Sequence, residues 1–238
     1  DANSRVVTID LRNNSTVSNA STGGAPGLRA DELAYDPTHG VLLVVNNADT
    51  PPFATFVIVN QSTGQLTVST RITFDAAHGV DAQNGAEQPV WDGALNRFFL
   101  SIPQIGPNVQ NGGVVRINPF SASVEATYPV NFCGPAGLTL GPNQNLFIGC
   151  NTVFDTNGNV WDPNGTVPAD PRDVIINANN GAIVATVFGL NERPTIFMFT
   201  PTMSAFWQAR VRIFWPPPPI MTGTLPMGLG WASCSAIW

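Results

Sequence analysis

Short apolar runs separated by polar turns recur along the chain. From Glu32 the stretch ELAYD alternates apolar and polar positions, and after the turn PTHG comes the continuous apolar run VLLVVNN. Alternation predicts a half-buried strand, and a short β-branched run between turns predicts a fully buried one. TFVIVN, the turn QSTG and the alternating QLTVSTRITF follow. The pattern therefore predicts four antiparallel strands within about 50 residues.

The same order of strands and turns occurs twice more. PVWD, GALN and RFFLSIP predict a hairpin from Pro89, and GVVRIN, PFSA and SVEATYPV predict the hairpin after it. GLTL, GPNQ and NLFIGC begin a third copy at Gly137, and after an insertion come DVIIN, ANNG and AIVATVFG. At the N-terminus, RVVTID and STVSNAST look like the last two strands of an earlier copy.

Four strands repeated at intervals of about 50 residues are typical of β-propeller blades. We therefore predict an all-β chain, a β-propeller of four-stranded antiparallel blades, with about four to five blades and a C-terminal blade that is incomplete. The predicted propeller region is 1–192, with a partial blade at 5–30 and blades at about 31–80, 87–132 and 133–190. The alternative is a β-sandwich whose strands are evenly spaced by coincidence.

The stretches DELAYDPTHGVLLVVNNAD, EQPVWDGALNRFFLSIPQ and CGPAGLTLGPNQNLFIGC resemble the blades of secreted YncE-like and lactonase-like propeller proteins. The gluconolactonase and NHL-repeat propellers belong to the same superfamily. The resemblance covers about residues 5–190 and implies the propeller fold. Such propellers include hydrolases, cofactor-dependent oxidoreductases and binding scaffolds, so the resemblance alone implies no single activity.

The charge balance removes several classes of function. The net charge is −6, and the chain has no lysine, so its ten cationic residues are all arginines, scattered along the sequence. A nucleic-acid-binding protein needs a basic face for phosphate contacts, so we expect no nucleic-acid partner. The absence of lysine excludes Schiff-base chemistry and the P-loop. No apolar run is long enough to span a membrane, so we expect no membrane partner.

Several features favour a secreted, extracellular glycoprotein. The chain begins at Asp1 rather than methionine, which is expected of a processed protein or of a fragment. Asn-x-Ser/Thr sequons, the acceptors of N-linked glycans, predict glycosylation in a secreted chain. They occur at Asn13, Asn14, Asn19, Asn60 and Asn164.

Two of the three cysteines flank one predicted hairpin. Cys133 precedes the first strand of the third copy, and Cys150 ends its second strand. Antiparallel pairing brings them near each other and predicts a disulfide, although the register counted from the turn is wrong by about three residues and requires a bulge. The alternative is two free, buried thiols. Cys234 has no obvious partner, and the absence of C-x-x-C argues against a zinc or thioredoxin-type site.

Polar residues at the ends of the predicted strands are the first candidates for a site. In a propeller, the loop before the first strand and the loop after the second face the central channel. We therefore predict a ligand-binding rim of Asp31, Glu32, Asn46, Asn47, Glu87, Gln88, Gln104 and Asn151. The alternative is that these groups only bind water and backbone.

Oxygen ligands on such a rim suit a divalent cation such as Ca²⁺. The resemblance to gluconolactonases implies a Glu and Asn/Asp metal site for lactone hydrolysis, and Glu32 and Glu87 match it by their place in the blades. Asn151 is a third candidate ligand on this rim. The third copy departs from this pattern, because Cys133 is followed by Gly134 and Pro135 where an acid is required. The next blade offers Glu192 as the corresponding acid only if the segment after it folds as a blade.

The insertion of the third copy offers a second candidate metal site. DTNGNVWD places oxygen ligands at alternate positions, as in a calcium loop, but lacks the Gly and Glu of that motif. The candidate ligands are Asp155, Asn157, Asn159 and Asp162, and the alternative is an ordinary Asn/Gly-rich surface loop. His78, between Asp75 and Asp81, allows a His–Asp pair, but no nucleophile motif accompanies it.

The composition changes abruptly at residue 193. Residues 193–238 contain no Asp, Glu or Asn, but hold all four methionines, four of the six tryptophans and a run of four prolines. The apolar stretches there alternate poorly and lack a clear turn. One interpretation is a C-terminal segment that packs as strands and completes the last blade. The other is a tail translated from a shifted reading frame or an unspliced intron.

The sequence thus predicts a secreted β-propeller that acts as a binding or scaffold protein through its channel rim or loop face. The ligand class stays open between a small molecule, a glycan and a protein. The alternative function is a metal-assisted hydrolase of the lactonase or gluconolactonase type. Oxygen ligands from three blades at one height in the channel would favour the enzyme.

Overall fold

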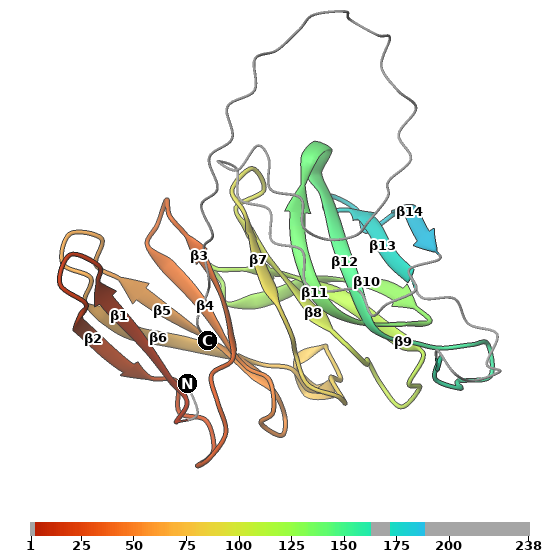
Figure 1. Ribbon diagram of the computed structural model, residues 1–238, viewed down its shortest axis with the longest axis horizontal. Coiled ribbons are helices and arrows are strands. Elements are labelled where there is room, and N and C mark those ends of the chain that lie inside the picture. Colours follow the sequence, from red (N-terminus) through yellow and green to blue (C-terminus); the bar gives the residue numbers. More distant parts are fainter. Residues whose placement is uncertain (1–2, 163–171, 189–238) are drawn as a thin grey trace, which may run out of the picture. The chain divides into compact units, whose positions relative to one another are not determined.

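The computed structural model describes residues 3–162 and 172–188 (Figure 1). The predictions for Asn164, for Glu192 and for the segment 193–238 lie outside these residues. The described residues form β-strands joined by turns, with two single-turn 3₁₀ helices, η1 (Ala76–His78) and η2 (Pro142–Gln144).

The strands form one pair and three four-stranded sheets. The pair, here called the half-blade, consists of β1 (Arg5–Asp10) and β2 (Ser15–Ser21). Blade 1 consists of β3 (Glu32–Asp36), β4 (Val41–Asn46), β5 (Phe53–Val59) and β6 (Leu66–Thr73). Blade 2 consists of β7 (Pro89–Asp92), β8 (Arg97–Ile102), β9 (Asn111–Asn118) and β10 (Ser123–Asn131). Blade 3 consists of β11 (Cys133–Gly141), β12 (Asn145–Val153), β13 (Arg172–Asn177) and β14 (Ile183–Phe188).

Strand order within each blade follows chain order, and every neighbouring pair is antiparallel. The four-stranded units predicted from the sequence are therefore confirmed in all three copies, and the N-terminal strands do form a separate pair. The register is regular in β3–β4, and bulges occur where the outer strands pair, as between β5 and β6. Such bulges increase the local twist of a sheet.

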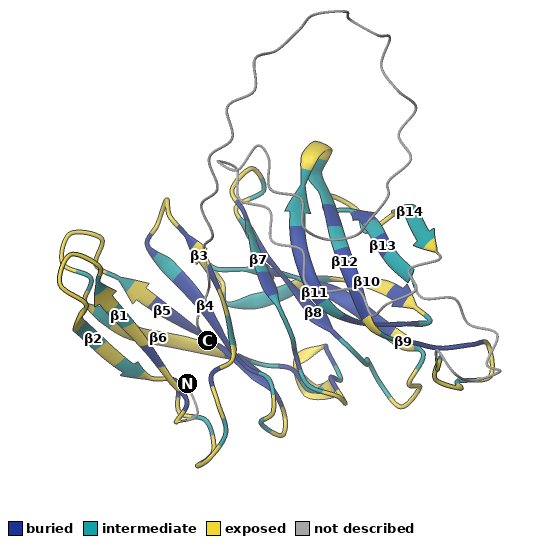
Figure 2. Cartoon of the chain, viewed as in Figure 1, coloured by how far each residue is buried: buried dark blue, intermediate teal, exposed yellow. Residues whose placement is uncertain are grey.

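The core consists of layers between the sheets. One cluster joins blade 1 to blade 2, with Leu43 and Phe56 packed in the same layer as Phe98 and Leu100. A second cluster joins blades 2 and 3, and a third joins the half-blade to blade 1. In Figure 2 the buried colour runs along the second strand of each blade, β4, β8 and β12. β4 and β8 are buried on both faces, which explains their continuous apolar sequences.

The acid that ends the first strand in blades 1 and 2 shapes the following turn. Oδ1 of Asp36 accepts hydrogen bonds from the amides of Thr38 (2.8 Å) and His39 (3.2 Å). The Asp92 carboxylate accepts equivalent bonds from the next turn. Side-chain oxygens of Asp commonly satisfy turn amides in this way. The recurring acid in ELAYD and PVWD is therefore a structural element of the turn.

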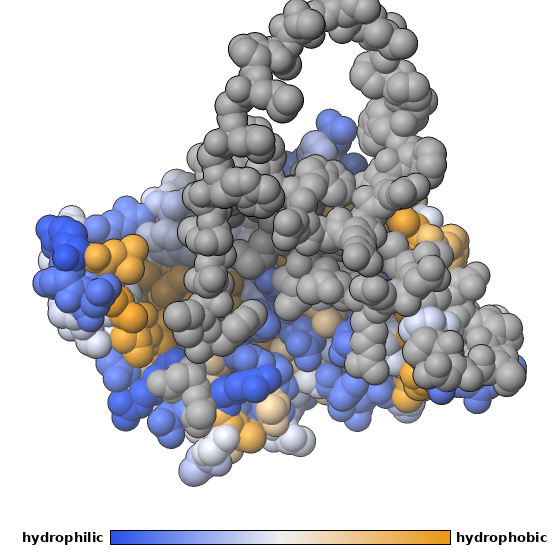
Figure 3. Space-filling view, in the orientation of Figure 1, coloured by the Kyte–Doolittle hydropathy of each residue, from blue (hydrophilic) through white to orange (hydrophobic). Residues whose placement is uncertain are grey.

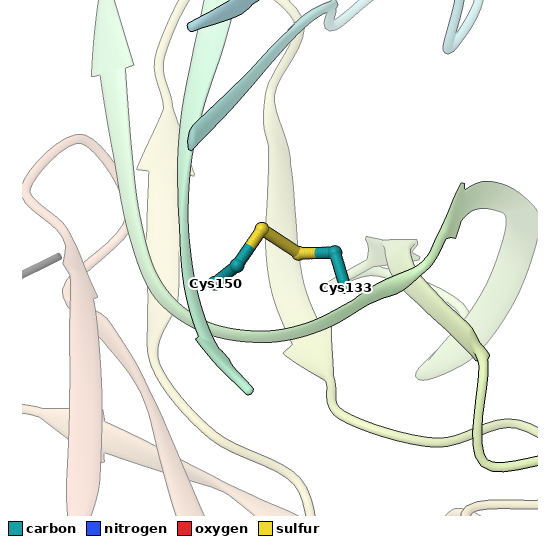
Figure 4. The surroundings of a disulfide bond; sticks show 2 residues. All are labelled: Cys133 and Cys150. Atoms are coloured by element: carbon teal, nitrogen blue, oxygen red, sulfur yellow. A yellow bond between two sulfur atoms is a disulfide. The ribbon is translucent and has the colours of Figure 1, made fainter. Parts of the chain in front are cut away.

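The disulfide predicted within blade 3 is present (Figure 4), so the alternative of free thiols is wrong. The Sγ atoms of Cys133 and Cys150 are 2.03 Å apart, and the Cα atoms are 5.2 Å apart. The register between β11 and β12 shifts on both sides of Pro135, which supplies the expected bulge. A bridge that closes a loop of this length contributes about 3 kcal/mol to stability. Both cysteines are also buried between blades 2 and 3.

Candidate functional site

Two glutamates from neighbouring blades lie on the predicted rim. Glu32 begins β3, and Glu87 precedes β7, which contacts β3. Burial raises the pKa of Glu32, and the negative charges of Asp31 and Glu87 raise it further. Burial and the charge of Asp31 likewise raise the pKa of Glu87. The structure therefore brings these carboxylates close enough for their charges to interact, which raises the cost of ionising both.

The negative charge of Asp31 is better compensated than the charges of Glu32 and Glu87. Its Oδ2 accepts a hydrogen bond from Asn47 Nδ2 at 3.0 Å and forms an ion pair with Arg29 Nη2 at 2.7 Å. The charge of Arg29 also lowers the pKa of Glu32 and Glu87, although burial outweighs it in both. Three carboxylates thus share one guanidinium, so two negative charges are left uncompensated when all three are ionised.

The other four predicted rim residues each have different surroundings. Gln88 connects blades, because its amide donates to Ala136 O (3.3 Å) and its Oε1 accepts from Leu138 N (3.3 Å). Asn46 is fully buried, and its Nδ2 donates to Ser4 Oγ (3.1 Å) on the side of the half-blade. The side chain of Gln104 donates to Gly106 O (3.0 Å).

Asn151 is exposed near the end of β12. The rim prediction thus corresponds to one local cluster of Asp31, Glu32, Asn47 and Glu87, which is smaller than the predicted ring.

A pocket of about 630 Å³ extends from this cluster. It lies between the loop that joins β4 to β5 and the connector between blades 1 and 2. Its polar lining consists of Asn47, Asp49, Thr50, Asp75, Asp81, Gln83, Asn84 and Glu87. Phe74 and the prolines 51 and 52 supply apolar surface. None of the described lining residues is an arginine, so the pocket carries an excess of negative charge.

The lining carboxylates differ in the hydrogen bonds that they accept from the protein itself. Oδ1 of Asp49 accepts from Ala25 N (2.8 Å), and Asp81 accepts from Gln83 Nε2. Asp75 is the N-cap of η1, and the side chain of His78 binds its Oδ1 at 2.6 Å. The hydrogen bond from His78 lowers the pKa of Asp75. The His–Asp contact that the sequence allows is present, and Asp75 acts in it as a helix N-cap.

Asn47 joins the rim cluster to the pocket. Its Nδ2 donates to Asp31, and a side-chain hydrogen bond from Asn47 also lowers the pKa of Glu87. Its Oδ1 is buried and has no hydrogen-bond partner in the described part of the chain. An unpaired buried carbonyl carries a free-energy cost that a hydrogen-bond donor from a ligand could relieve.

The repeat pattern of the sequence did not predict the pocket. Asp75, Asp81, Gln83 and Asn84 lie in a connector that has no counterpart in the strand pattern. The available signal was the polar, glycine-containing composition of DAAHGVDAQNG, which indicates a loop and nothing more specific.

The second candidate metal site is organised by internal hydrogen bonds. Oδ1 of Asp155 accepts from the amides of Asn157 (2.9 Å) and Asn159 (2.8 Å), and Oδ2 accepts from Asn159 Nδ2 (2.9 Å). These bonds, with Asn159 first, lower the pKa of Asp155. Within residues 3–162 and 172–188 no group of three or more His, Cys, Asp or Glu side chains is arranged to hold a metal ion.

One perturbed acid was not anticipated. Burial raises the pKa of Asp173, on β13, to about 6, although a hydrogen bond from the backbone of Cys150 lowers it. Its Oδ1 is buried without a partner among the described residues. The sequence DVIIN gives no sign of this, because the neighbour of a strand residue depends on the register.

Four predicted glycosylation sites can be located. Asn13 and Asn14 lie in the turn between β1 and β2, Asn19 lies on β2, and Asn60 lies in the turn after β5. All four are exposed. Glycosylation itself stays a prediction. The described residues include no helix that is long and apolar enough to cross a membrane.

Comparisons with known proteins identify the fold. No protein-family model matches the chain, and no curated protein matches its sequence. The solved structure of the Dos1 propeller superposes with a TM-score of 0.51 at 10% identity, covering 79% of this chain and 43% of that one. Sqt1 of Saccharomyces cerevisiae superposes with a TM-score of 0.55 at 12% identity, covering 87% of this chain and 48% of that one.

The chain therefore has the β-propeller fold, as predicted, and the two-layer sandwich is wrong. It spans less than half the length of either solved structure. At these identities the likeness shows the fold alone.

Proposed function

We propose that this propeller chain is a binding protein whose ligand is a small cation, either a divalent metal ion such as Ca²⁺ or an organic ammonium group. The observation that carries the proposal is the pocket beside Glu87, whose described lining has four carboxylates and no arginine. Burial raises the pKa of Glu87, and the negative charge of Asp31 raises it further. A cation beside Glu87 would offset this charge repulsion.

The shape of the pocket supports a small ligand. A volume of about 630 Å³ is within the range of small-molecule sites. Phe74 and the prolines 51 and 52 would contact the carbon skeleton of an organic cation. Asn47 Oδ1 would accept a hydrogen bond from an ammonium group or coordinate a metal ion.

Calorimetric titration of the whole chain at pH 7.5 with CaCl₂ and, separately, with putrescine tests the proposal. We expect one of the two probes to bind and Glu87→Gln to weaken that binding at least tenfold. Glu125→Gln is the matched control, because it removes the same charge from an Arg97–Glu125 pair that does not line the pocket. Equal binding by both variants, or no binding of either probe, would refute the proposal.

A metal-assisted hydrolase of the lactonase type, within the YncE-like and lactonase-like family, is the second candidate. Its support is the charge interaction between Glu32 and Glu87, which the family resemblance assigned to a metal site. The test is hydrolysis of δ-gluconolactone in a pH-stat, with and without Ca²⁺. A Ca²⁺-dependent rate that Glu32→Gln abolishes would favour the enzyme, and an unchanged background rate would eliminate it.

We also propose that the protein is secreted. The bridge between Cys133 and Cys150 fits an oxidising compartment, and the exposed sequons at Asn19 and Asn60 are accessible to glycosylation. Intact-mass analysis of the protein from culture medium, before and after glycosidase treatment, checks the location and the glycans together.

A further inference from the structure

Asparagine followed by glycine is the dipeptide in which an asparagine side chain loses ammonia most readily. The backbone nitrogen of the glycine attacks the side-chain carbonyl, and glycine, which has no Cβ, obstructs that approach least. The described residues contain such pairs at Asn84, Asn111, Asn157 and Asn180, and the pair at Asn164 lies outside them. The fold gives the described pairs different surroundings.

The pair Asn84–Gly85 lies in the connector between blades 1 and 2. Asn84 is exposed and lines the pocket beside Glu87. In Figure 1 this connector runs along the lower edge of the view between β6 and β7, and Figure 3 shows that edge as mostly hydrophilic surface. Neither the side chain of Asn84 nor the backbone N–H of Gly85 makes a hydrogen bond with the described residues. No such bond therefore holds the attacking nitrogen or the carbonyl in place.

The structure explains why glycine follows Asn84. Gly85 has a φ of 81°, a conformation that L side chains rarely adopt. A Cβ at this position would lie 3.0 Å from the carbonyl oxygen of Asn47, which is closer than most Cβ contacts. The backbone at this point of the connector therefore requires glycine, and that requirement places an unshielded backbone nitrogen next to an exposed asparagine.

At two of the other pairs the glycine amide already donates a hydrogen bond. Gly158 N donates to Asp155 O at 3.2 Å, and Gly181 N donates to Asn177 O at 2.8 Å. Each bond must open before the nitrogen can attack the preceding side chain. Because opening it costs free energy, we expect slower reaction at both pairs.

The fourth described pair is held in a strand. Asn111 and Gly112 begin β9, within the ladder that joins β9 to β10. Gly112 is buried, and a Cβ there would lie 2.3 Å from Cys133 O. Closing the imide ring requires the backbone to move, and tightly packed neighbours oppose that movement. Among the described pairs, only Asn84–Gly85 lies outside a strand and has a glycine amide without a hydrogen bond.

We propose that Asn84 is a site of spontaneous deamidation, and that its conversion adds a carboxylate to the lining of the pocket. Gly85 N bonds to Cγ of Asn84, the bond from Cγ to the side-chain nitrogen breaks, and ammonia leaves with the amide proton of Gly85. One water molecule then opens the cyclic imide. Cleavage of the new Cγ–N bond gives aspartate, and cleavage of the backbone C–N bond gives isoaspartate. Water is the only co-reactant.

The product changes the pocket that is proposed above to bind a cation, so this consequence rests on the proposed function. The unmodified lining has the carboxylates of Asp49, Asp75, Asp81 and Glu87. A further negative charge attracts a cation more strongly. Aged protein therefore binds the cation more tightly than newly made protein.

Peptide mapping of the full chain tests the assignment. Because the chain has no lysine, trypsin cleaves after arginine and releases residues 72–97, which contain Asn84. Deamidation raises the mass of that peptide by about 1 Da. During incubation at about 37 °C and about pH 8.5, we expect Asn84 to convert at least about fivefold faster than Asn157 or Asn180, where a hydrogen bond must open first.

The unfolded chain is the control for the effect of sequence alone. In guanidinium chloride the hydrogen bonds of the fold are absent, so the described Asn–Gly pairs should convert at similar rates. Asn84→Gln should abolish the mass increase at this position, because glutamine must close a larger ring that forms less readily. Conversion of Asn157 or Asn180 as fast as that of Asn84 in the folded chain, or a ranking unchanged in guanidinium chloride, would overturn the assignment.

Calorimetric titration tests the consequence for the pocket separately. Asn84→Asp reproduces the aspartate product, and we expect it to bind CaCl₂ or putrescine, whichever binds the parent, about threefold more tightly than Asn84→Gln does. Equal affinity of the two variants would overturn the effect on the pocket. If neither probe binds the parent, the proposed function fails, whereas peptide mapping still decides whether Asn84 is the site of deamidation.

Discussion

The acids of the rim and the acids of the turns face opposite electrostatic conditions. In the turns, Asp36 and Asp155 lie at positions where backbone amides donate hydrogen bonds to them, and the pKa of Asp155 is lowered by such bonds. On the rim, Glu32 and Glu87 are partly buried beside other carboxylates, and their pKa values are raised. Acids of the first kind stabilise the fold, whereas acids of the second kind destabilise it.

The difference indicates where a function would be placed. An acid that accepts hydrogen bonds from turn amides is already stabilised by the protein, so a bound ligand would add little stability there. An acid kept at a cost in stability persists only if something else compensates, and a bound cation is one such compensation. The comparison thus separates the rim cluster from the Asp155 loop, although both looked like metal sites in the sequence.

Among the substitutions that test this comparison, we expect the largest loss of folding stability in the turn of blade 1. Asp36→Ala removes a fully buried carboxylate that accepts from two amides and from His39 Nδ1. We expect a loss of about 2–3 kcal/mol, because three hydrogen bonds to a fully buried carboxylate are lost. Urea unfolding monitored by intrinsic fluorescence measures it. A loss below about 0.5 kcal/mol, the usual effect of a surface substitution, would contradict the structural role.

The pH dependence of stability is the second test. A raised folded-state pKa means that the folded protein binds its proton first, so stability rises as the pH falls. For Asp173, with a pKa of about 6 against 3.8, the gain occurs between about pH 7 and pH 4. After allowance for solvent screening it amounts to about 2 kcal/mol at most. Glu32 and Glu87 act in the same direction.

The acids with lowered pKa values reverse this trend at lower pH. Asp75 and Asp155 stabilise the folded state above their ordinary value of 3.8, and that contribution is lost as the pH falls further. We therefore expect maximal stability near pH 4. Asp173→Asn should be more stable than the parent at pH 7. Its stability should therefore increase less than that of the parent as the pH falls from about 7 to 4. A parent curve that falls steadily from pH 7 would show that the raised pKa values are wrong.

The third test concerns the partner of Asp36. Nδ1 of His39 lies 2.6 Å from Asp36 Oδ2, whereas the equivalent Asp92 Oδ2 has no partner in the described part of the chain. His39→Ala should cost about 1 kcal/mol, the contribution of one such hydrogen bond. Leu95→His is the converse substitution, because it places a histidine beside Asp92 at the position in blade 2 that matches His39. Equal stability of the parent and His39→Ala would show that the bond contributes nothing.

The smallest effect on stability is expected on the rim itself. Glu87→Gln removes a partly buried charge next to Asp31 and should stabilise the chain by under about 1 kcal/mol at pH 7. The gain should disappear below pH 4, where the glutamate is protonated. Differential scanning calorimetry at both pH values measures it. Destabilisation at pH 7 would place Glu87 among the structural acids.

The strand pattern and the disulfide could be derived from the sequence, while the pocket could not. VLLVVNN and RFFLSIP predicted β4 and β8 because a strand buried on both faces must be continuously apolar. Cys133 and Cys150 flank one hairpin, so their approach follows from local pairing. The roles of Asp75 and Asp81 depend on where a connector lies against another loop, and no local pattern encodes that.

The sequence by itself determined the repeating unit, its four strands and the acid at the first turn of blades 1 and 2, because these depend on contacts between residues close in the chain. Only the tertiary structure decided which acids are satisfied and which are crowded. The crowding of Glu32, Glu87 and Asp31 depends on the packing of β3 against β7 and on burial between blades. Electrostatic cost is a property of neighbours in space, and the neighbours that matter here come from different repeats.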